Sequence, residues 1–310
     1  MSFIKDHKSP DGVGYSLAHL QAGELEAGVH SFGARTTYIR HWGTDLILHY
    51  PDPLDYFTDP YYVGAIVGRV ANRLARAQIE VDGKPYPLAP NEGDKQLHGG
   101  PGGLSQVHWQ MDPLGEDRNG VKLSYVSPDG DQGHPHEVLF EVEFELSETE
   151  LIYRMRAIPD APTPINMAQH NYYSLGALEG AKLTAPASHY TPVDEDQIPT
   201  GTIDPVDGDK FDYREGRSLH PEIDHNLALD HPRSAVVYEN QSHRLTLHCD
   251  QPGLQVYSGA GLGAPFAPYQ GICLEPQLFP NAFNQKGFDA PLATPDAPYE
   301  QVLRLEIRTK

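Results

Sequence analysis

Cysteine is scarce in this sequence, which contains only Cys249 and Cys273 among its 310 residues. Two cysteines cannot build a disulfide framework or a cysteine-based zinc site. A pair of free thiols is typical of a reducing compartment, and residues 1–17 lack the apolar segment of a signal peptide. These features predict a cytoplasmic protein.

Long apolar runs and basic residues are also scarce. No run approaches the roughly 18 apolar residues that a membrane-spanning helix requires. The 43 acidic residues outnumber the 23 lysines and arginines, so the formal net charge is -20. A chain this acidic repels the phosphates of nucleic acids and anionic lipid surfaces. We therefore expect neither a nucleic acid nor a membrane among its partners.

Several catalytic signatures are missing as well. The sequence has no glycine-rich phosphate-binding loop of the nucleotide-binding types and no G-x-S-x-G nucleophile elbow. His134 and His136 form a close pair of potential metal ligands, but no third histidine or carboxylate stands at a typical metal-binding interval. An exposed turn is the preferred interpretation of that pair, and we expect neither a metal nor a cofactor.

Alternation of apolar and polar residues with a period of two dominates the rest of the chain. It predicts half-buried strands over Phe140–Leu146 and Leu151–Met155, joined by a turn. Asp82-Gly83 predicts a two-residue hairpin turn between Ile79–Val81 and Lys84–Leu88. Further strands are expected over Leu303–Ile307 and, as a three-stranded meander, over Ala235–Tyr238, Arg244–Cys249 and Gly253–Ser258.

Helical periodicity is rare, and only Tyr15–Gln21 and Val63–Ala77 are expected to hold a turn or two of helix. No internal repeat or linker divides the chain, so we predict one all-β domain over residues 1–310. The loops Ala89–Val107 and Ser188–Asp224 are long and poor in strand pattern. Loops of that length on a β scaffold more often carry functional residues than serve only as connections.

Polar side chains crowd into five segments of this β-rich pattern. The segments are Gly68–Leu74 with Gln96–Gly100, Pro164–Leu175, Ile223–Leu227, Leu254–Gly259 and Gly271–Asn284. In the last of them, Glu275 directly follows the apolar run Ile272–Leu274. A carboxylate in a buried apolar run costs several kcal/mol unless it is paired or takes part in chemistry. Taken singly, each segment also admits a structural explanation, such as a salt bridge, a capped turn or a core histidine.

In order and wording, these segments resemble the aldose 1-epimerase family, which is also called galactose mutarotase. The matching phrases are GRVANRLA, QLHGG, the segment around His170, DHN, LQVYSG and GICLEPQLFPNAFN. The resemblance implies the family fold, a large antiparallel β-sandwich (the galactose mutarotase-like supersandwich) with few short helices. This fold agrees with the alternation described above.

The resemblance also implies an isomerase that interconverts the α and β anomers of free hexoses such as galactose or glucose. His170 matches the family's general acid, which protonates the ring oxygen, and Glu275 matches the general base, which deprotonates the anomeric hydroxyl. The family's substrate-binding positions are matched by Arg73, His98, Asp224 and Gln255, and Asn72 is expected to lie next to them. Tyr257 and Phe279 are expected to form apolar walls or core packing. We expect His170 to carry the proton while Glu275 is ionised, about 5–8 Å apart.

Two alternatives stay open: an epimerase of the same fold that acts on a phosphorylated or different sugar, and a non-catalytic sugar-binding module. A phosphorylated sugar requires a cationic cluster, and the motifs offer mainly Arg69, Arg73 and Arg76. Four positions depart from the family phrases, namely Gln169, Asn171, Asn281 and Leu104, the last in place of an aromatic residue after the HGG loop. The sequence leaves open the effect of these departures, the preferred sugar, the choice between monomer and homodimer, and closure of the 188–224 loop.

Overall fold

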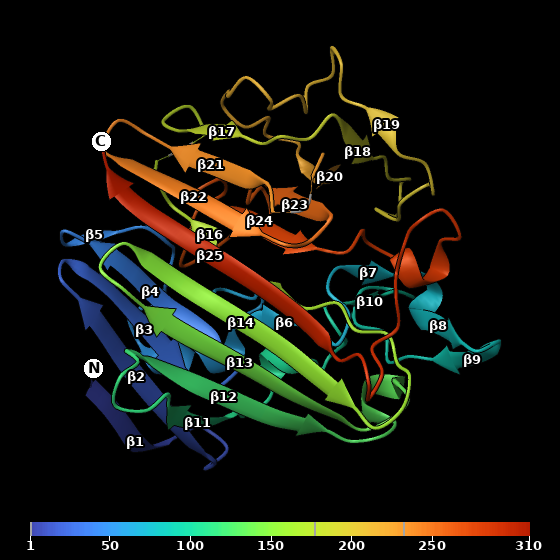
Figure 1. The fold of residues 1–310 in the computed structure, drawn as a ribbon, viewed down its shortest axis with the longest axis horizontal. Helices are drawn as coiled ribbons and strands as arrows, with labels where there is room; N and C mark the ends of the chain where they lie inside the picture. The colour runs from blue at the N-terminus through green and yellow to red at the C-terminus, as the bar shows by residue number, and fades with distance from the viewer. Residues whose placement is uncertain (1, 177, 232) are drawn as a thin grey trace.

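Three antiparallel sheets form the frame of the molecule (Figure 1). The structure is a computed structural model that describes residues 2–176, 178–231 and 233–310. The eight-stranded sheet contains, in spatial order, β11 (Gln110–Pro113), β12 (Gly120–Ser127), β13 (Val138–Leu146), β14 (Glu150–Pro159), β25 (Tyr299–Thr309), β22 (His243–Cys249), β21 (Ala235–Glu239) and β17 (Lys182–Thr184).

Two further sheets stand against this one. The six-stranded sheet has the order β16 (Tyr172–Tyr173), β24 (Ile272–Gln277), β23 (Gly253–Tyr257), β20 (Asp224–Ala228), β18 (His189–Thr191) and β19 (Asp204–Pro205). The five-stranded sheet runs in chain order through β1 (Ser2–Lys8), β2 (Gly14–Ala22), β3 (Leu25–His30), β4 (Arg35–His41) and β5 (Thr44–Asp45). The all-β, antiparallel prediction is confirmed.

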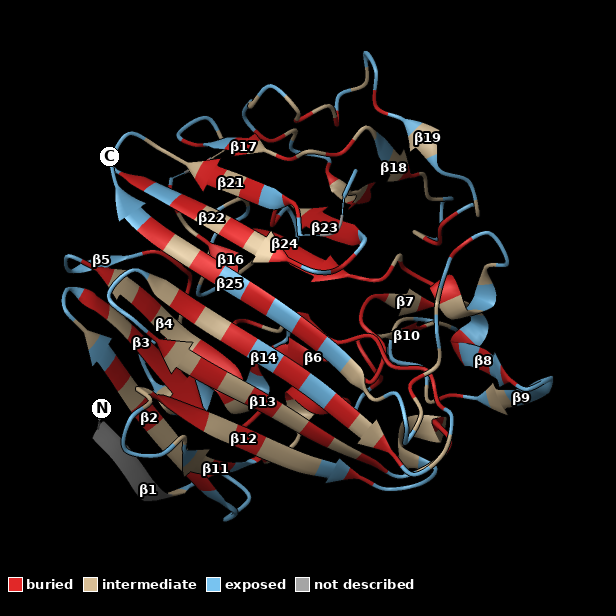
Figure 2. Cartoon of the chain, viewed as in Figure 1, coloured by how far each residue is buried: buried red, intermediate tan, exposed pale blue. Residues whose placement is uncertain are grey.

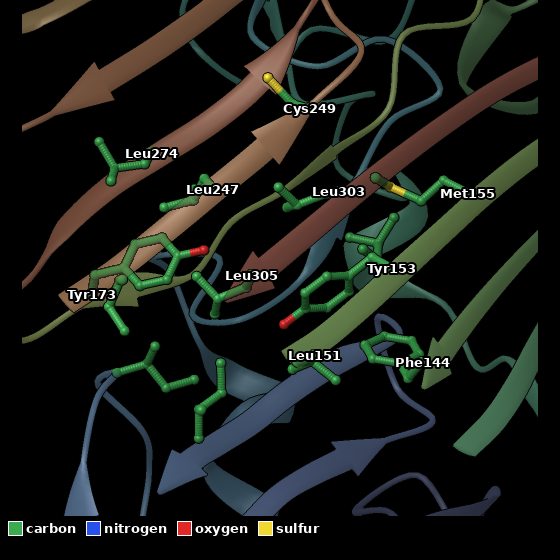
Figure 3. Close-up of a cluster of buried hydrophobic side chains, with 14 of the residues drawn as sticks. Phe144, Leu151, Tyr153, Met155, Tyr173, Leu247, Cys249, Leu274, Leu303 and Leu305 are labelled. Carbon is green, nitrogen blue, oxygen red and sulfur yellow. The ribbon is translucent and has the colours of Figure 1, made fainter. Parts of the chain in front are cut away.

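The main core lies between these sheets because each contributes one apolar face. Along β13, buried residues alternate with partly exposed ones, which appears as red and tan bands in Figure 2. The buried set includes Phe144 of β13, Leu305 of β25 and Leu274 of β24, from two different sheets (Figure 3). Full burial of each such side chain stabilises the fold by about 1.5–3 kcal/mol.

The solvent-facing side chains of the eight-stranded sheet form ladders of opposite charges. Glu143 and Glu145 of β13 both pair with Arg118, at 2.8 and 2.7 Å, and Glu141 pairs with Lys122 at 3.0 Å. These three glutamates of β13 are therefore matched by nearby cations, and each such exposed pair contributes little stability.

Helices are few and short, as expected. They are the 3-10 segments η1 (Pro53–Thr58), η2 (Ala75–Ala77), η3 (Leu104–Gln106), η4 (Asp131–Gly133) and η5 (Ala282–Asn284). The longest has six residues, and none of the helices in the described ranges is long and apolar enough to cross a membrane.

Two hairpins appear where the sequence predicts them. Strand β13 pairs over its full length with residues 151–159 of β14, and β8 (Gln78–Val81) pairs with β9 (Lys84–Pro87). The turn of the second hairpin places Asp82 and Gly83 at φ of 52° and 76°. Two positive φ values match the twist of the flanking strands, which is why this dipeptide favours a hairpin.

Two local predictions are wrong and a third holds only in part. Tyr15–Gln21 is not helical but part of strand β2. The Val63–Ala77 region contains one short helical segment, η2, as expected, and also the short strands β6 (Ile66–Val67) and β7 (Arg73–Leu74). The three-stranded meander ends after β22, because β23 crosses to the six-stranded sheet and pairs there with β20 and β24. Strand β23 is buried on both faces for four of its five residues, so alternation could not assign it to a sheet.

The register of the six-stranded sheet brings polar side chains to one face. Residue 226 pairs with residue 255, and residue 255 pairs with residue 275. Directly paired residues point to the same face of a sheet, so Asn226, Gln255 and Glu275 share one face. Asp224 lies two residues before Asn226 on the same strand, so its side chain is on that face as well. The intervening Leu227, Leu254 and Leu274 belong to the core.

Candidate active site

A cavity of about 200 Å³ lies over the polar face of the six-stranded sheet. It is small beside the roughly 300–1,000 Å³ of drug-sized ligand pockets, so it suits a ligand the size of one sugar ring. All seven site residues predicted from the sequence line it. The lining residues are Pro60, Tyr61, Tyr62, Asn72, Arg73, Leu97, His98, His170, Tyr172, Asp224, Gln255, Tyr257 and Glu275.

His170 and Glu275 are in direct contact range at the base of this pocket. Nε2 of His170 lies 3.8 Å from Oε1 of Glu275, and the two side chains are 6% and 3% exposed. The separation is shorter than the expected 5–8 Å. Strand β16 pairs with β24 through Tyr172 and Cys273, and His170 lies two residues before β16, in the connection from β15 (Ala168–Gln169). The backbone of His170 bonds to residues 64 and 65, and the side chains of His170 and Glu275 line the same pocket.

Burial sets the protonation of this pair. Desolvation lowers the pKa of His170 to about 4. Desolvation also raises the pKa of Glu275 well above its ordinary value, Asp224 raises it further, and Arg73 opposes both. Both shifts favour the neutral forms. The two shifts thus favour a proton on Glu275 over one on His170, whereas the sequence led us to expect it on His170.

A thiol lies behind the imidazole of His170. Sγ of Cys273 is 3.6 Å from Nδ1 of His170, and both side chains are buried. Burial raises the pKa of the Cys273 thiol well above its usual range, and Glu275 adds to this shift. Cys273 therefore stays a neutral thiol, and its contact fixes the rear edge of the His170 ring while Nε2 faces the pocket.

His98 enters the pocket from the small sheet of β7 and β10 (Gln96–Leu97). The backbone N–H of Asn72 donates to Nδ1 of His98 at 3.2 Å. Because Nδ1 accepts, the neutral ring carries its hydrogen on Nε2, and desolvation lowers the pKa of His98 well below its ordinary value. The ring of Tyr62 packs against both imidazoles, 4.7 Å from His98 and 5.7 Å from His170 between centroids.

Arg73 is held by carboxylates on two sides. Glu92 accepts from its Nε at 2.7 Å and from its Nη2 at 3.0 Å. On the other side, Nη1 of Arg73 lies 3.7 Å from Oδ2 of Asp224, and Nε2 of Gln255 donates to Oδ1 of Asp224 at 2.6 Å. This chain of contacts fixes Arg73, Asp224 and Gln255 relative to one another.

Two buried oxygens in the pocket accept no hydrogen bond from the described residues. They are Oε1 of Gln255 and Oε2 of Glu275. Buried polar atoms are nearly always hydrogen-bonded. The two oxygens are therefore suited to the hydroxyl groups of a ligand, which donate and accept equally well.

His98, His170 and Glu275 have the composition of a metal site, and their ligand atoms lie within 4.8 Å of one another. A metal requires a lone pair on the ring nitrogen that faces it. The hydrogen bond from Asn72 to His98 leaves the hydrogen on the pocket-facing nitrogen. The donor set therefore fits hydrogen bonding to a polar ligand better than it fits a metal ion.

Other sequence interpretations need correction. Phe279 lies outside this pocket, where it packs on Phe288 with ring centroids 5.1 Å apart, whereas Tyr257 lines the pocket. Instead of occupying an exposed turn, His134 is fully buried and bonds to Gln96 at 2.7 Å. Its role is structural, because Gln96 begins the segment that carries His98.

Three residues of the pocket region were not singled out from the sequence. Tyr62 and Tyr172 are ordinary aromatic residues in their segments, and the spacing of neither marks it as part of a site. Glu92 stands in a loop whose only visible signal is its place next to the QLHGG phrase. Its pairing with Arg73, nineteen residues away in sequence, becomes visible only in three dimensions.

Comparison with known proteins is consistent over the whole chain. Residues 16–306 match the family model described as aldose 1-epimerase. The galactose mutarotase of Sus scrofa is 35% identical over 94% of this chain and 93% of its own length. The aldose 1-epimerase of Escherichia coli is 30% identical over 91% of this chain and 92% of its own length.

The fold agrees with a solved structure as well. The crystal structure of galactose 1-epimerase from Lactobacillus acidophilus superposes with a TM-score of 0.91 at 26% identity, and the match covers 99% of this chain and 98% of the other. The sequence matches and the structural match thus indicate the same family over nearly the full length of the chain. The chain belongs to the aldose 1-epimerase family and is an isomerase of the epimerase class.

Proposed function

We propose that this protein is a mutarotase that interconverts the α and β anomers of free hexoses such as galactose or glucose. The observation that carries the proposal is the contact of His170 with Glu275 inside a pocket the size of one sugar ring. Relatives named galactose mutarotase support the choice of substrate. The family match over residues 16–306 supports treating the chain as one domain.

In the proposed mechanism, ring opening moves two protons. Glu275 takes the proton of the anomeric hydroxyl and His170 gives a proton to the ring oxygen. The C1–O5 bond breaks and C1 becomes an aldehyde. Rotation about C1–C2 then presents the other face of the aldehyde, and ring closure reverses both transfers. The reaction needs no net change in the number of protons on the pair.

The resting pair reaches its reactive form by one internal transfer. In the structure, electrostatics favours neutral His170 and protonated Glu275. Moving that proton from Glu275 to His170 yields the acid and the base that ring opening uses, with the same total charge. The 3.8 Å separation of the two groups places them within reach of each other through a small adjustment or one hydroxyl of the ligand.

The remaining polar groups are assigned to the hydroxyls of the sugar. Arg73 and His98 supply donors, Asp224 supplies an acceptor, and Gln255 and Asn72 supply amides that do both. Tyr62 and Tyr172 wall the pocket beside His170. Such walls exclude water and strengthen the hydrogen bonds inside.

The two alternatives are less well supported. A phosphorylated sugar requires several cations, but Arg69 is buried against the carbonyls of Pro128, Pro135 and other residues outside the pocket. Of the three arginines near the motifs, only Arg73 lines the pocket. A binding module that does no chemistry has no use for a buried acid–base pair.

Polarimetry or NMR exchange spectroscopy on freshly dissolved α-D-galactose tests the proposal. Glu275→Gln and His170→Asn should each lower the enzymatic rate by about 10²–10⁴-fold. The exposed Glu195 and His231 provide matched controls, Glu195→Gln and His231→Asn, whose rates should equal that of the wild type. Near-normal rates in both site variants would refute the assignment. Galactose binding by the wild type without exchange above buffer would instead favour a binding module.

A further inference from the structure

Arg73 is the only lysine or arginine among the described residues that line the pocket. Arginine recognises carboxylates and phosphates through two parallel N–H donors on one edge of its guanidinium. Here the edge formed by Nε and Nη2 is already occupied by the carboxylate of Glu92. The remaining Nη1 faces Asp224 at 3.7 Å. The Nε–Nη2 edge of Arg73 is therefore closed to a charged ligand group, while Nη1 and the second hydrogen of Nη2 remain as donors for sugar hydroxyls.

The position of Glu92 is built into a tight turn. The N–H of Glu92 donates to the carbonyl of Lys95 at 3.2 Å, and the N–H of Lys95 donates to the carbonyl of Glu92 at 3.0 Å. Gly93 follows Glu92 with φ of +63°, a conformation that glycine adopts without strain. The turn thus presents the Glu92 carboxylate to Arg73 from behind the pocket.

The charges around the pocket are therefore unfavourable to an anion. Arg73 contributes one positive charge, and Glu92 and Asp224 contribute two negative charges next to it. The two imidazoles add none, because burial keeps His98 and His170 neutral. An anionic sugar would enter a water-poor site where like charges repel it and where the one cation is already paired.

We infer that Glu92 is a specificity-determining residue, which reserves the pocket for uncharged sugars by occupying the carboxylate-binding edge of Arg73. The inference rests on the proposed mutarotase function. It adds to that function a residue that discriminates between uncharged and anionic sugars. Uronic acids, which carry a carboxylate in place of the terminal hydroxymethyl group of a hexose, are the sugars that Glu92 rejects. Removal of the Glu92 charge should therefore admit them.

The test compares anomer exchange of galactose and of galacturonate by NMR, in the wild type and in Glu92→Gln and Glu92→Ala. The ratio of kcat/KM for galacturonate to that for galactose should rise by at least about tenfold in both variants. Asp94→Asn is the matched control, because Asp94 is exposed in the same turn and its substitution removes one negative charge without freeing Arg73. The control should leave the ratio unchanged.

The outcomes separate this inference from the proposal on which it rests. Variants that retain galactose exchange and show an unchanged ratio would overturn the role of Glu92 and leave the mutarotase assignment standing. An equal rise of the kcat/KM ratio in Asp94→Asn would show a general charge effect and would also overturn the role of Glu92. If the wild type exchanged the anomers of no neutral hexose, the proposed function itself would be refuted. Thermal unfolding by circular dichroism identifies a misfolded variant, and the second substitution then decides the question.

Discussion

Nε2 of His170 lies 3.8 Å from Oε1 of Glu275. Glu275 is held by the register of β24 within its sheet, and the connection that carries His170 is held by backbone hydrogen bonds of residue 170 with residues 64 and 65. Backbone pairing is among the most rigid ways to hold two side chains. This arrangement gives the two groups one shared proton, and it makes a definite prediction for the pH dependence of the reaction.

The rate should be bell-shaped in pH with a wide plateau. Below about pH 4, where His170 titrates, both groups are protonated and no base remains. Above the raised pKa of Glu275, the pair loses its proton and no acid remains. We expect kcat/KM for galactose to fall on the acid side only near pH 4 and on the alkaline side only above the raised pKa of Glu275.

NMR exchange over a range of pH, with the buffer-catalysed rate subtracted, measures this profile. An acid limb near pH 6.5, the ordinary value for histidine, would contradict the electrostatic description of the pair. The exposed-histidine variant His231→Asn provides the control, since its profile should coincide with that of the wild type.

The turn that carries Tyr62 depends on a buried ion pair. Nη1 of Arg35 lies 2.6 Å from Oδ2 of Asp59, and both side chains are 0% exposed. Asp59 also accepts from the N–H groups of Tyr61 at 2.9 Å and Val63 at 2.7 Å. Asp59→Asn leaves the guanidinium buried without a counter-charge, so we expect a loss of about 3–5 kcal/mol in the free energy of unfolding.

Urea denaturation measures this loss, and Asp45→Asn is the matched control. Asp45 pairs with Arg40 at 2.9 Å, but the two side chains are 41% and 33% exposed. Loss of that exposed pair should change the free energy by less than about 1 kcal/mol. Equal effects of the two substitutions would show that burial of the Arg35–Asp59 pair does not matter. A folded Asp59→Asn should also have reduced activity, because Tyr62 packs on His98 and His170.

Asn281, a departure from the family phrase, has a defined structural role. Its backbone is left-handed at φ of 57°, a conformation that asparagine tolerates better than most residues. Its Oδ1 accepts from the N–H of Ala75 at 3.1 Å and from Nδ2 of Asn284 at 2.8 Å. The side chain thus anchors the segment that directly follows Arg73 and Leu74 of β7.

Both bonds need only an acceptor at position 281, and an aspartate also provides one. Asn281→Asp should therefore keep galactose activity within about twofold and change stability by less than about 1 kcal/mol. Asn281→Leu removes the acceptor and places an aliphatic residue at positive φ, at a cost of about 2–4 kcal/mol. Chemical denaturation and the galactose assay measure both variants. A Leu variant as stable as Asp would refute the anchoring role.

The sequence predicted those parts of the fold in which one face of a strand is exposed to solvent. Strands β13 and β14 alternate strictly, and their hairpin was predictable for that reason. Strand β23 is buried on both faces, and no local pattern reveals its neighbours. Register is a property of two segments together, so the close approach of His170 to Glu275 was not predictable from either segment.

The residues of the candidate site also divide into those that the sequence identifies and those that only the structure identifies. Residues within the matching phrases could be named, and they line one pocket. Glu92 could not be named, because its role depends on a partner reached through the pairing of β7 with β10. The pKa shifts of the pair could not be predicted either, since a sequence gives the types of ionisable groups but not the depth of their burial.

Acid stability provides a last prediction, which concerns His134. Its side chain is fully buried and its Nε2 bonds to Oε1 of Gln96 at 2.7 Å. Burial, with the charge of Arg69, lowers the pKa of His134 to about 3. In the unfolded chain the group titrates near 6.5, so between these values the unfolded state binds the extra proton. Stability from His134 is therefore complete above about pH 6.5 and is lost as the pH falls.

Each pKa unit corresponds to about 1.4 kcal/mol, so His134 alone should account for about 2 kcal/mol of the stability lost between pH 6.5 and pH 5. His134→Gln keeps a donor for Gln96 but cannot be protonated in this range. Its free energy of unfolding, measured in urea at both pH values, should fall by about 2 kcal/mol less than that of the wild type. His231→Gln, at an exposed position, should fall as the wild type does. Equal losses in all three proteins would mean that protonation of His134 does not drive the acid destabilisation.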